Sequence, residues 1–303
     1  MFDFFKGLFP DKYKDELKID SSNLSMNTSN ITASAGPKSK TVYRVASCQS
    51  SGKERTHNED TIFTLNSLID GMDSPISFGI FLVADGMGGH QSGEIASRLA
   101  AQATSQYLIE NIFNKFIYDR EDYSDSILRQ YLEDAVKAAQ KLINQRVPGG
   151  GTTLTLVLVL CDRLYFVHVG DCRLYKIDLD GKLELKTKDH SLVKRLIDLG
   201  EIVESEASNH PQRNILYRAL GQADPFEPDI GQFSLQKGER FLICSDGLWG
   251  VVDEEKMMQI INNHEIEIEQ IACSLVEAAN EAGGPDNISL ILVECLEKSQ
   301  GIK

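Results

Sequence analysis

Hydrophobic and polar positions follow two different rhythms along residues 41–297. Apolar side chains spaced three or four residues apart predict amphipathic helices at residues 92–115, 124–146 and 266–282. Short tracts rich in Val, Ile, Leu and Phe predict strands at residues 41–47, 61–65, 78–84, 152–160, 163–169, 173–177, 182–187, 240–245 and 288–296. The chain is therefore expected to contain both helices and β-sheets.

The predicted strands also indicate how the layers are arranged. Several of them, such as "TTLTLVLVL" (152–160), have no polar alternation, so both of their faces must be covered. The links between the four strands in residues 152–187 are too short for helical crossovers, which predicts an antiparallel meander. We expect an α+β fold, a four-layer α-β-β-α sandwich with two antiparallel sheets packed face to face and helices outside.

The N-terminal part of the chain has a different composition. Residues 21–39 are rich in Ser, Thr and Asn and have few large apolar side chains, which is typical of a flexible tether. We expect a flexible tail over residues 1–40, one folded domain over 41–298 and a short C-terminal tail over 299–303. The apolar start "MFDFFKGLF" is too short for a secretory signal or a membrane span, and it is either loosely packed or a small docking segment.

The net charge indicates which partners are unfavourable, and the cysteine content indicates the redox environment. The formal net charge is −14, so nucleic acid or an anionic membrane surface would be repelled overall. None of the six cysteines forms a C-x-x-C pair, and most lie in apolar tracts where a reduced thiol behaves as a small hydrophobic side chain. We expect a cytoplasmic monomer with no nucleic-acid partner and no integral membrane segment.

Aspartates recur at the ends of the predicted strands. They are Asp60, Asp85, Asp171, Asp246 and Asp286. An Asp-Gly pair alone most often marks a hairpin turn, as expected for Asp180-Gly181. The pairs that begin at Asp85 and Asp246 lead instead into Gly-rich or helical segments, which favours a functional role.

Carboxylates gathered at one end of a sandwich repel one another unless a cation holds them together. The chain has no His/Cys set with zinc spacing, and an all-oxygen site suits Mg²⁺ or Mn²⁺. Gly86, beside Asp85, would let a backbone carbonyl approach such an ion. Two ions about 3.5–4 Å apart could share a water, lower its pKa and direct it at a phosphorus or carbonyl centre. This pattern predicts a hydrolase.

Arg55, in "RTHNED" (55–60), lies close to Asp60 in the sequence. A guanidinium group binds phosphate oxygens in a bidentate manner. A single arginine of this kind is ordinarily part of a surface ion pair. The surrounding acidic residues favour a role for Arg55 in binding substrate.

Eight sequence blocks resemble, in the same order, those of the metal-dependent protein phosphatases of type 2C, and especially their compact bacterial-type members. The resemblance covers about residues 41–297. The blocks are "RTHNED" (55–60), "LVADGMGGHQSGEIAS" (82–97), "GGGTTLTLVLV" (149–159), "VHVGDCRLYKI" (167–177), "KDHSLV" (188–193), "NHPQRNILYRALG" (209–221), "LICSDGLWGVVDEE" (242–255) and "GGPDNISLILVE" (283–294).

The resemblance implies a binuclear Mn²⁺ or Mg²⁺ centre, with two ions per chain. Its ligands would be Asp60, Asp85, the Gly86 carbonyl, Asp246 and Asp286. Asp171, together with Asp246, would support a third, weaker ion. The resemblance also implies that Arg55 binds the phosphate, that Glu59 acts through metal-bound water and that Asn287 orients the ligand. The folded region 41–298 would then be the catalytic domain.

One position departs from the family pattern. Met87 stands where animal and plant relatives have a histidine that protonates the leaving group. His90 follows three residues later, either as a structural residue or as a proton donor, and metal-bound water or a group of the flap could also donate. The flap corresponds to residues 188–221. Its basic residues that could contact substrate are Lys194, Arg195, Arg213 and Arg218.

The implied activity is hydrolysis of phosphoserine and phosphothreonine on proteins by a metal-bridging hydroxide, opposing a serine/threonine kinase. No cysteine is followed by Arg at the sixth position and no G-x-x-x-x-G-K-[ST] loop is present, which argues against a cysteine-nucleophile phosphatase and a nucleotide hydrolase. A pseudophosphatase that binds phosphoproteins without turnover is the alternative, although the retained carboxylates count against it. A third hypothesis adds recruitment to a membrane or partner by the tail.

Overall fold

A computed structural model describes residues 41–69, 76–88, 91–119, 123–207, 210–222, 227–263 and 265–297. The expected tails, residues 1–40 and 299–303, and His90 lie outside these ranges. No helix in the described part of the chain has the length and hydropathy needed to cross a membrane.

Two five-stranded sheets form the centre of the described domain, and every strand pair within them is antiparallel. The first sheet contains, in spatial order, β1 (Thr41–Ser50), β12 (Ile288–Glu297), β11 (Arg240–Cys244), β8 (Arg173–Ile177) and β9 (Leu183–Leu185). The second contains β10 (Asp229–Phe233), β7 (Arg163–Val169), β6 (Leu154–Leu160), β3 (Ile76–Ala84) and β2 (Thr61–Ile69). A short ladder joins β4 (Gly86–Met87) to β5 (Gly151–Thr152).

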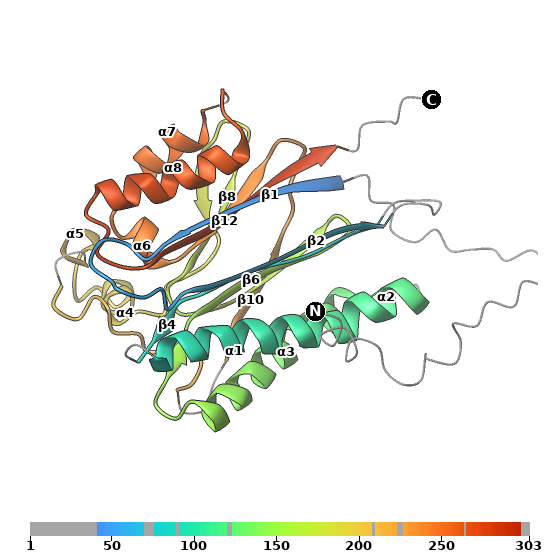
Figure 1. Cartoon of the computed structure of the whole chain (residues 1–303), viewed down its shortest axis with the longest axis horizontal. Helices are drawn as coiled ribbons and strands as arrows, with labels where there is room; N and C mark the ends of the chain where they lie inside the picture. Colours follow the sequence, from blue (N-terminus) through green and yellow to red (C-terminus); the bar gives the residue numbers. More distant parts are fainter. Residues whose placement is uncertain are drawn as a thin grey trace, which may run out of the picture. The chain divides into compact units, whose positions relative to one another are not determined.

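Helices cover the outer faces of both sheets (Figure 1). The second sheet is covered by α1 (Gln91–Leu108) and α3 (Asp125–Arg146), and a π-helical turn (Ile109–Phe113) continues α1 into α2 (Asn114–Asp119). The first sheet is covered by α7 (Glu254–Ile261) and α8 (Ile268–Glu281). The shorter helices α4 (Leu192–Asp198), α5 (Glu204–Ala207) and α6 (Asp246–Trp249) lie at one end of the sandwich.

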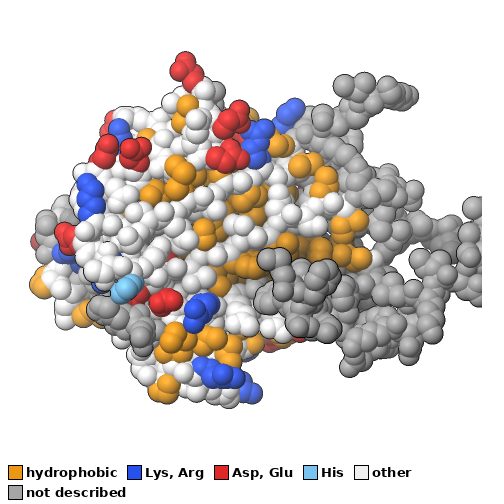
Figure 2. All heavy atoms as spheres, in the orientation of Figure 1, with side chains coloured by type: hydrophobic (Ala, Val, Ile, Leu, Met, Phe, Trp, Pro, Cys, Tyr) orange, Lys and Arg blue, Asp and Glu red, His pale blue; other side chains and the backbone are white. Residues whose placement is uncertain are grey.

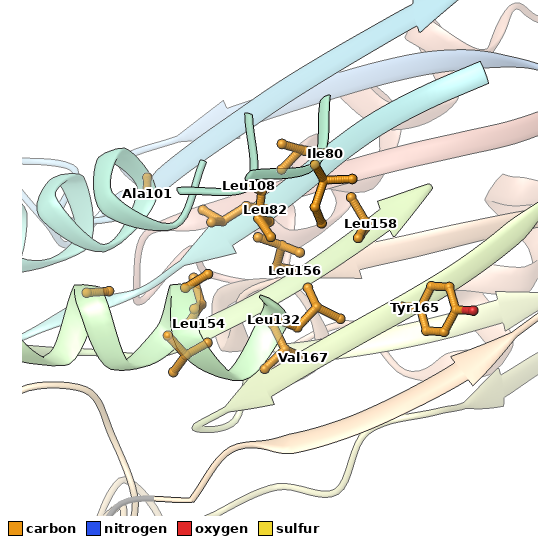
Figure 3. Close-up of a cluster of buried hydrophobic side chains, with 14 of the residues drawn as sticks. Ile80, Leu82, Ala101, Leu108, Leu132, Leu154, Leu156, Leu158, Tyr165 and Val167 are labelled. Atoms are coloured by element: carbon orange, nitrogen blue, oxygen red, sulfur yellow. The ribbon is translucent and has the colours of Figure 1, made fainter. Parts of the chain in front are cut away.

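Three hydrophobic layers hold these elements together. In β3, Ile80 and Leu82 face α1 and α3, whereas Phe81 and Val83 face the first sheet. Figure 3 shows the layer under α1 and α3, where Leu132 of α3 meets the side chains of β3, β6 and β7. A third layer packs α7 and α8 against the first sheet. Because the central strands are buried on both faces, they lack polar alternation, and the expected four-layer α+β sandwich is confirmed.

The expected meander over residues 152–187 is wrong. The strands β6 and β7 pair, and so do β8 and β9, but β7 and β8 belong to different sheets. The short segment between them includes Gly170, whose φ of 105° is unfavourable for other residues, and it carries the chain from one sheet to the other. In place of β8, β7 pairs with β10, a strand with a weak apolar pattern that the sequence did not predict.

We predict that Leu82→Ala destabilises the fold much more than Leu179→Ala. Leu82 is completely buried between β3 and the helices, whereas Leu179 is 61% exposed. Removal of buried methyl groups from a packed layer should cost about 2–5 kcal/mol of unfolding free energy. Urea unfolding followed by circular dichroism measures the difference, and equal losses in the two variants would contradict the layered core.

Candidate metal centre

The strand registers bring all five strand-end aspartates to the same end of the sandwich. The first residue of β2 pairs with the last residue of β3, so Asp60 and Asp85 leave the second sheet side by side. The end of β11 pairs near the start of β12, which does the same for Asp246 and Asp286 on the first sheet. Asp171 follows the end of β7. This end pairs with the start of β6, which in turn lies next to the end of β3. Both sheets therefore contribute to one acidic cluster.

Burial and mutual repulsion make these carboxylates hard to ionise. The pKa of Asp60 is raised to about 7, mainly by burial and also by the charges of Asp246 and Asp286, while nearby Ser289 and Ser245 hydroxyls offset part of the rise. For Asp85 the pKa lies well above its usual value because of burial and then the charges of Asp60, Asp246, Asp171 and Asp286. The cluster therefore carries more negative charge than its own residues can stabilise.

Several carboxylate oxygens in the cluster have no hydrogen-bond partner among the described residues. Within that part of the chain, both Oδ atoms of Asp60 and Oδ1 of Asp246 are buried and unpaired, and the serine hydroxyls near Asp60 are not in hydrogen-bonding geometry. A buried, unpaired carboxylate oxygen is costly, and a hard divalent cation is the partner that such oxygens prefer. The donor chemistry thus fits Mg²⁺ or Mn²⁺.

The cluster is not a closed coordination shell in this arrangement. Within the described ranges, no group of three or more Asp, Glu, His or Cys side chains is placed to hold a metal ion as it stands. Asp286 is engaged elsewhere, because its Oδ2 accepts a hydrogen bond of 2.8 Å from Nη2 of Arg55. The observation that the cluster suits a cation therefore rests on the unpaired oxygens of Asp60 and Asp246.

Backbone hydrogen bonds fix the turn that presents Asp85. The Asp85 N–H donates to Oγ1 of Thr153 at 2.9 Å, and the Asp85 carbonyl accepts from the Thr153 N–H and the Thr152 hydroxyl, each at 2.8 Å. At Gly86 a Cβ atom would lie only 2.3 Å from the carbonyl oxygen of Gly93, so no larger residue fits there. The glycine in this Asp-Gly pair is required by close packing of the backbone.

Asn287 joins the two segments that carry the other acidic residues. Its Oδ1 accepts from the Glu59 N–H at 2.8 Å, and its Nδ2 donates to the carbonyls of Ser51 and His57 at 3.0 and 2.8 Å. The Asn287 N–H also donates to Oδ1 of Asp286 at 2.8 Å. The side chain of Asn287 thus holds the backbone of Ser51, His57 and Glu59 beside Asp286.

Asp171 is connected to the cluster from the side of β8. Burial raises its pKa well above the usual value, and Asp246 is the largest charge contribution. Its carbonyl accepts a hydrogen bond of 3.0 Å from Nε1 of Trp249, and the Trp249 ring stacks 3.6 Å from the guanidinium of Arg173. Arg173 in turn forms two hydrogen bonds to Asp189, at 3.1 and 2.8 Å.

The sequence pattern gives no indication of three of these supporting residues, Arg173, Trp249 and Thr153. Arg173 and Trp249 lie inside quoted blocks, but their contact joins positions far apart in the chain. Thr153 lies in an apolar strand tract where a polar side chain gives no signal of its own. Only the fold brings these groups beside the aspartates.

Three basic residues of the flap contact other flap residues or the strand β10. Arg218 donates to Oδ1 of Asp229 at 2.8 Å, Arg195 lies 5.7 Å from the centre of the Tyr217 ring, and Lys194 is 3.8 Å from Glu204. These are three of the four basic side chains that could contact substrate.

Met87 takes part in the short ladder beside the cluster. It pairs with Gly151 of β5 through the backbone, and its thioether side chain lies next to that glycine. A thioether has no proton to give, so Met87 cannot replace the histidine of animal and plant relatives.

On the face that Figure 2 shows, the described Lys and Arg side chains are scattered among acidic ones and form no continuous basic surface.

The family model for protein phosphatase 2C matches residues 57–277. The serine/threonine phosphatase stp of Listeria innocua is 34% identical over 243 residues, which cover 80% of this chain and 92% of that protein. The crystal structure of the Mycobacterium tuberculosis serine/threonine phosphatase PstP/Ppp has a TM-score of 0.69 and 34% identity, over 84% of this chain and 99% of that one.

A second structure, the catalytic domain of PstP, is in complex with two manganese ions; it has a TM-score of 0.68 and 32% identity, over 84% of this chain and 99% of that one. The chain belongs to the protein phosphatase 2C family. It is a protein serine/threonine phosphatase.

We predict that the metal-free protein loses stability between about pH 5 and pH 8 because of Asp60. Its pKa is about 7 when folded and 3.8 in the unfolded reference, so the folded state binds the proton more tightly. This contribution is fully present below the unfolded value and is lost as the pH rises through the folded one. In chelator, the loss should be roughly 1–3 kcal/mol.

Asp60→Asn cannot titrate and should lack this component of the pH dependence. Chemical denaturation of both proteins at the two pH values compares them directly. Parallel stability profiles for the wild type and the variant would show that Asp60 is not the titrating group.

Proposed function

We propose that this phosphatase hydrolyses phosphoserine and phosphothreonine on proteins through a binuclear centre held by the strand-end aspartates, and that it opposes a serine/threonine kinase. The ligands would be Asp60, Asp85, the Gly86 carbonyl, Asp246 and Asp286, with Asp171 and Asp246 supporting a third, weaker ion. The observation that carries the proposal is the set of buried, unpaired oxygens of Asp60 and Asp246 beside an arginine at the mouth of the cluster.

Each group of the site has a separate role in this proposal. Mn²⁺ or Mg²⁺ bound by the carboxylates would lower the pKa of water and supply the hydroxide that attacks phosphorus. Asp60 and Asp85 come from the second sheet and Asp246 and Asp286 from the first, so the packing of the two sheets would set the spacing of the ligands. The manganese ions in the related PstP catalytic domain support a divalent cation here.

Arg55 would bind the phosphate of a large substrate. Its side chain is 52% exposed and lies at the edge of the acidic cluster. The 2.8 Å hydrogen bond to Asp286 holds the guanidinium there before substrate arrives. An exposed guanidinium can accept a phosphorylated side chain that protrudes from a folded protein, which suits a protein substrate better than a buried pocket would.

Glu59 and Asn287 support the backbone that carries the proposed ligands. Glu59 Oε2 lies close to Gly93, beside Gly86, and the Glu59 carbonyl accepts from the Ser97 hydroxyl at 2.6 Å. Asn287 accepts a hydrogen bond from the Glu59 N–H, so the backbone just before Asp60 is held by Asn287 on one side and by Ser97 on the other. We propose that both residues position the ligands, with Glu59 acting through metal-bound water, and that residues 41–298 form the catalytic domain.

We predict that Asp246→Asn abolishes hydrolysis of a phenyl phosphate and of a phosphothreonine peptide. Loss of one anionic ligand should lower kcat/KM by at least about 100-fold, because the remaining carboxylates bind the cations too weakly. Asp180→Asn, at an exposed turn, is the matched control and should keep full activity.

Chelation provides the second half of this test. Excess EDTA should abolish the activity of the wild type, and added Mn²⁺ or Mg²⁺ should restore it. Full turnover in EDTA would rule out the proposed chemistry, and phosphopeptide binding without any turnover would favour the pseudophosphatase instead.

We predict that Arg55→Ala lowers kcat/KM for a phosphothreonine peptide by about 10- to 100-fold, as expected for loss of a charged hydrogen bond to phosphate. Arg55→Lys keeps the charge but not the bidentate geometry, and should recover only part of the loss. Arg98→Ala, on the exposed surface of α1, is the control. Steady-state kinetics that show equal values for all three variants would remove Arg55 from substrate binding.

A further inference from the structure

Two cysteines outside the acidic cluster face each other at the surface. Cys48 lies in β1 and Cys273 in α8, separated by 225 positions in the sequence, and their Sγ atoms are 2.8 Å apart. Both are free thiols; Cys48 is half-buried and Cys273 is exposed. The remaining four cysteines are buried, as expected for small hydrophobic side chains in the core.

Contacts on both sides keep this pair together. Toward the start of α8, Arg44 of β1 forms an ion pair of 3.2 Å with Glu267. Toward its end, Nδ2 of Asn280 donates to Oγ of Ser50 at 3.2 Å. The helix is also anchored beneath by buried residues that pack on the first sheet. The two thiols thus meet between two further contacts that join the same strand and helix, with their sulfur atoms already close together.

We propose that Cys48 and Cys273 form a peroxide-sensitive dithiol whose oxidation ties α8 covalently to β1. In the first step the sulfur of Cys273 attacks one oxygen of hydrogen peroxide and the O–O bond breaks. Cys273 becomes a sulfenic acid, and the other oxygen leaves as water with the thiol proton. In the second step the Cys48 sulfur attacks the Cys273 sulfur, and the hydroxyl departs with the Cys48 proton as water. Two thiols and one peroxide thus give one disulfide and two waters.

The environments of the two sulfurs fix the order of these steps. Burial, followed by the neighbouring Cys273, raises the pKa of Cys48 to about 11, so Cys48 stays protonated near neutral pH. The thiol in solvent is Cys273, which an oxidant can reach from outside. Cys273 is therefore the residue that peroxide oxidises, and Cys48 is the residue that resolves the sulfenic acid.

The disulfide would lie beside the frame of the proposed active site. β1 leads into the segment that contains Arg55, and α8 leads into the segment that contains Asp286. These two segments already touch, since the Lys53 N–H donates to the Gly284 carbonyl at 2.7 Å. A covalent bond between elements so far apart in sequence also restricts the unfolded chain, which should raise the thermal midpoint.

The full-length protein, reduced and freed of reductant, is treated with hydrogen peroxide and compared with Cys273→Ser and Cys48→Ser. Peptide mapping without reductant should show a single cross-link, between residues 48 and 273, and an intact mass lower by two hydrogen atoms. The thermal midpoint should rise by about 5 °C and return when a phosphine reductant is added. Both variants should lack the cross-link and the shift, and the buried cysteines should remain unmodified.

Three results would overturn the proposal. These are oxygen atoms added to Cys273 without a cross-link, covalent dimers through Cys273, and two thiols that can still be alkylated after treatment. Because mass and thermal midpoint are read without any phosphatase assay, the outcome is independent of the function proposed for the acidic cluster.

Discussion

The structure depends on one electrostatic constraint, which is that several carboxylates are held together where water cannot fully solvate them. Asp85 experiences the charges of the four other strand-end aspartates, and burial raises the pKa values of Asp60 and Asp246 to about 7 and about 6. Such a cluster would disperse in a flexible loop region. It persists because each carboxylate is attached to the end of a strand whose other residues are locked into the hydrophobic layers.

The spacing of the cluster is therefore set by the packing between the sheets. Asp60 and Asp85 leave the second sheet and Asp246 and Asp286 leave the first, and the layer between the sheets is built from residues such as Phe81. Close-packed interiors transmit small changes in volume, so the core between the sheets acts on the distances between the carboxylates. The buried side chains of β3 and β11 therefore stabilise the fold and also set the positions of the aspartates at the ends of these strands.

The sequence was sufficient for the longest helices, for most strands and for the meeting of the aspartates, because strand ends that carry Asp are visible as apolar tracts that stop at a charge. It did not predict β10 or the helix α7, whose apolar patterns are short. It was insufficient at Gly170, where the chain changes sheets, since the short links there also suit a meander. Contacts such as Arg173 with Trp249 and Cys48 with Cys273 join distant positions, and periodicity has no information about them. The Arg55–Asp286 ion pair belongs to the same class, although both residues were identified individually.

Cation binding and folding are linked in a protein built this way. The repulsion that raises the pKa values is a cost of the folded, metal-free state, and the unfolded chain does not bear it because its carboxylates are far apart and solvated. A divalent cation that binds only the folded state removes this cost and adds its own binding free energy. The unpaired oxygens of Asp60 and Asp246 are thus a weakness of the metal-free fold and the reason that it would select a hard cation. Substituting these carboxylates with neutral isosteres should stabilise the metal-free fold and remove its preference for a hard cation.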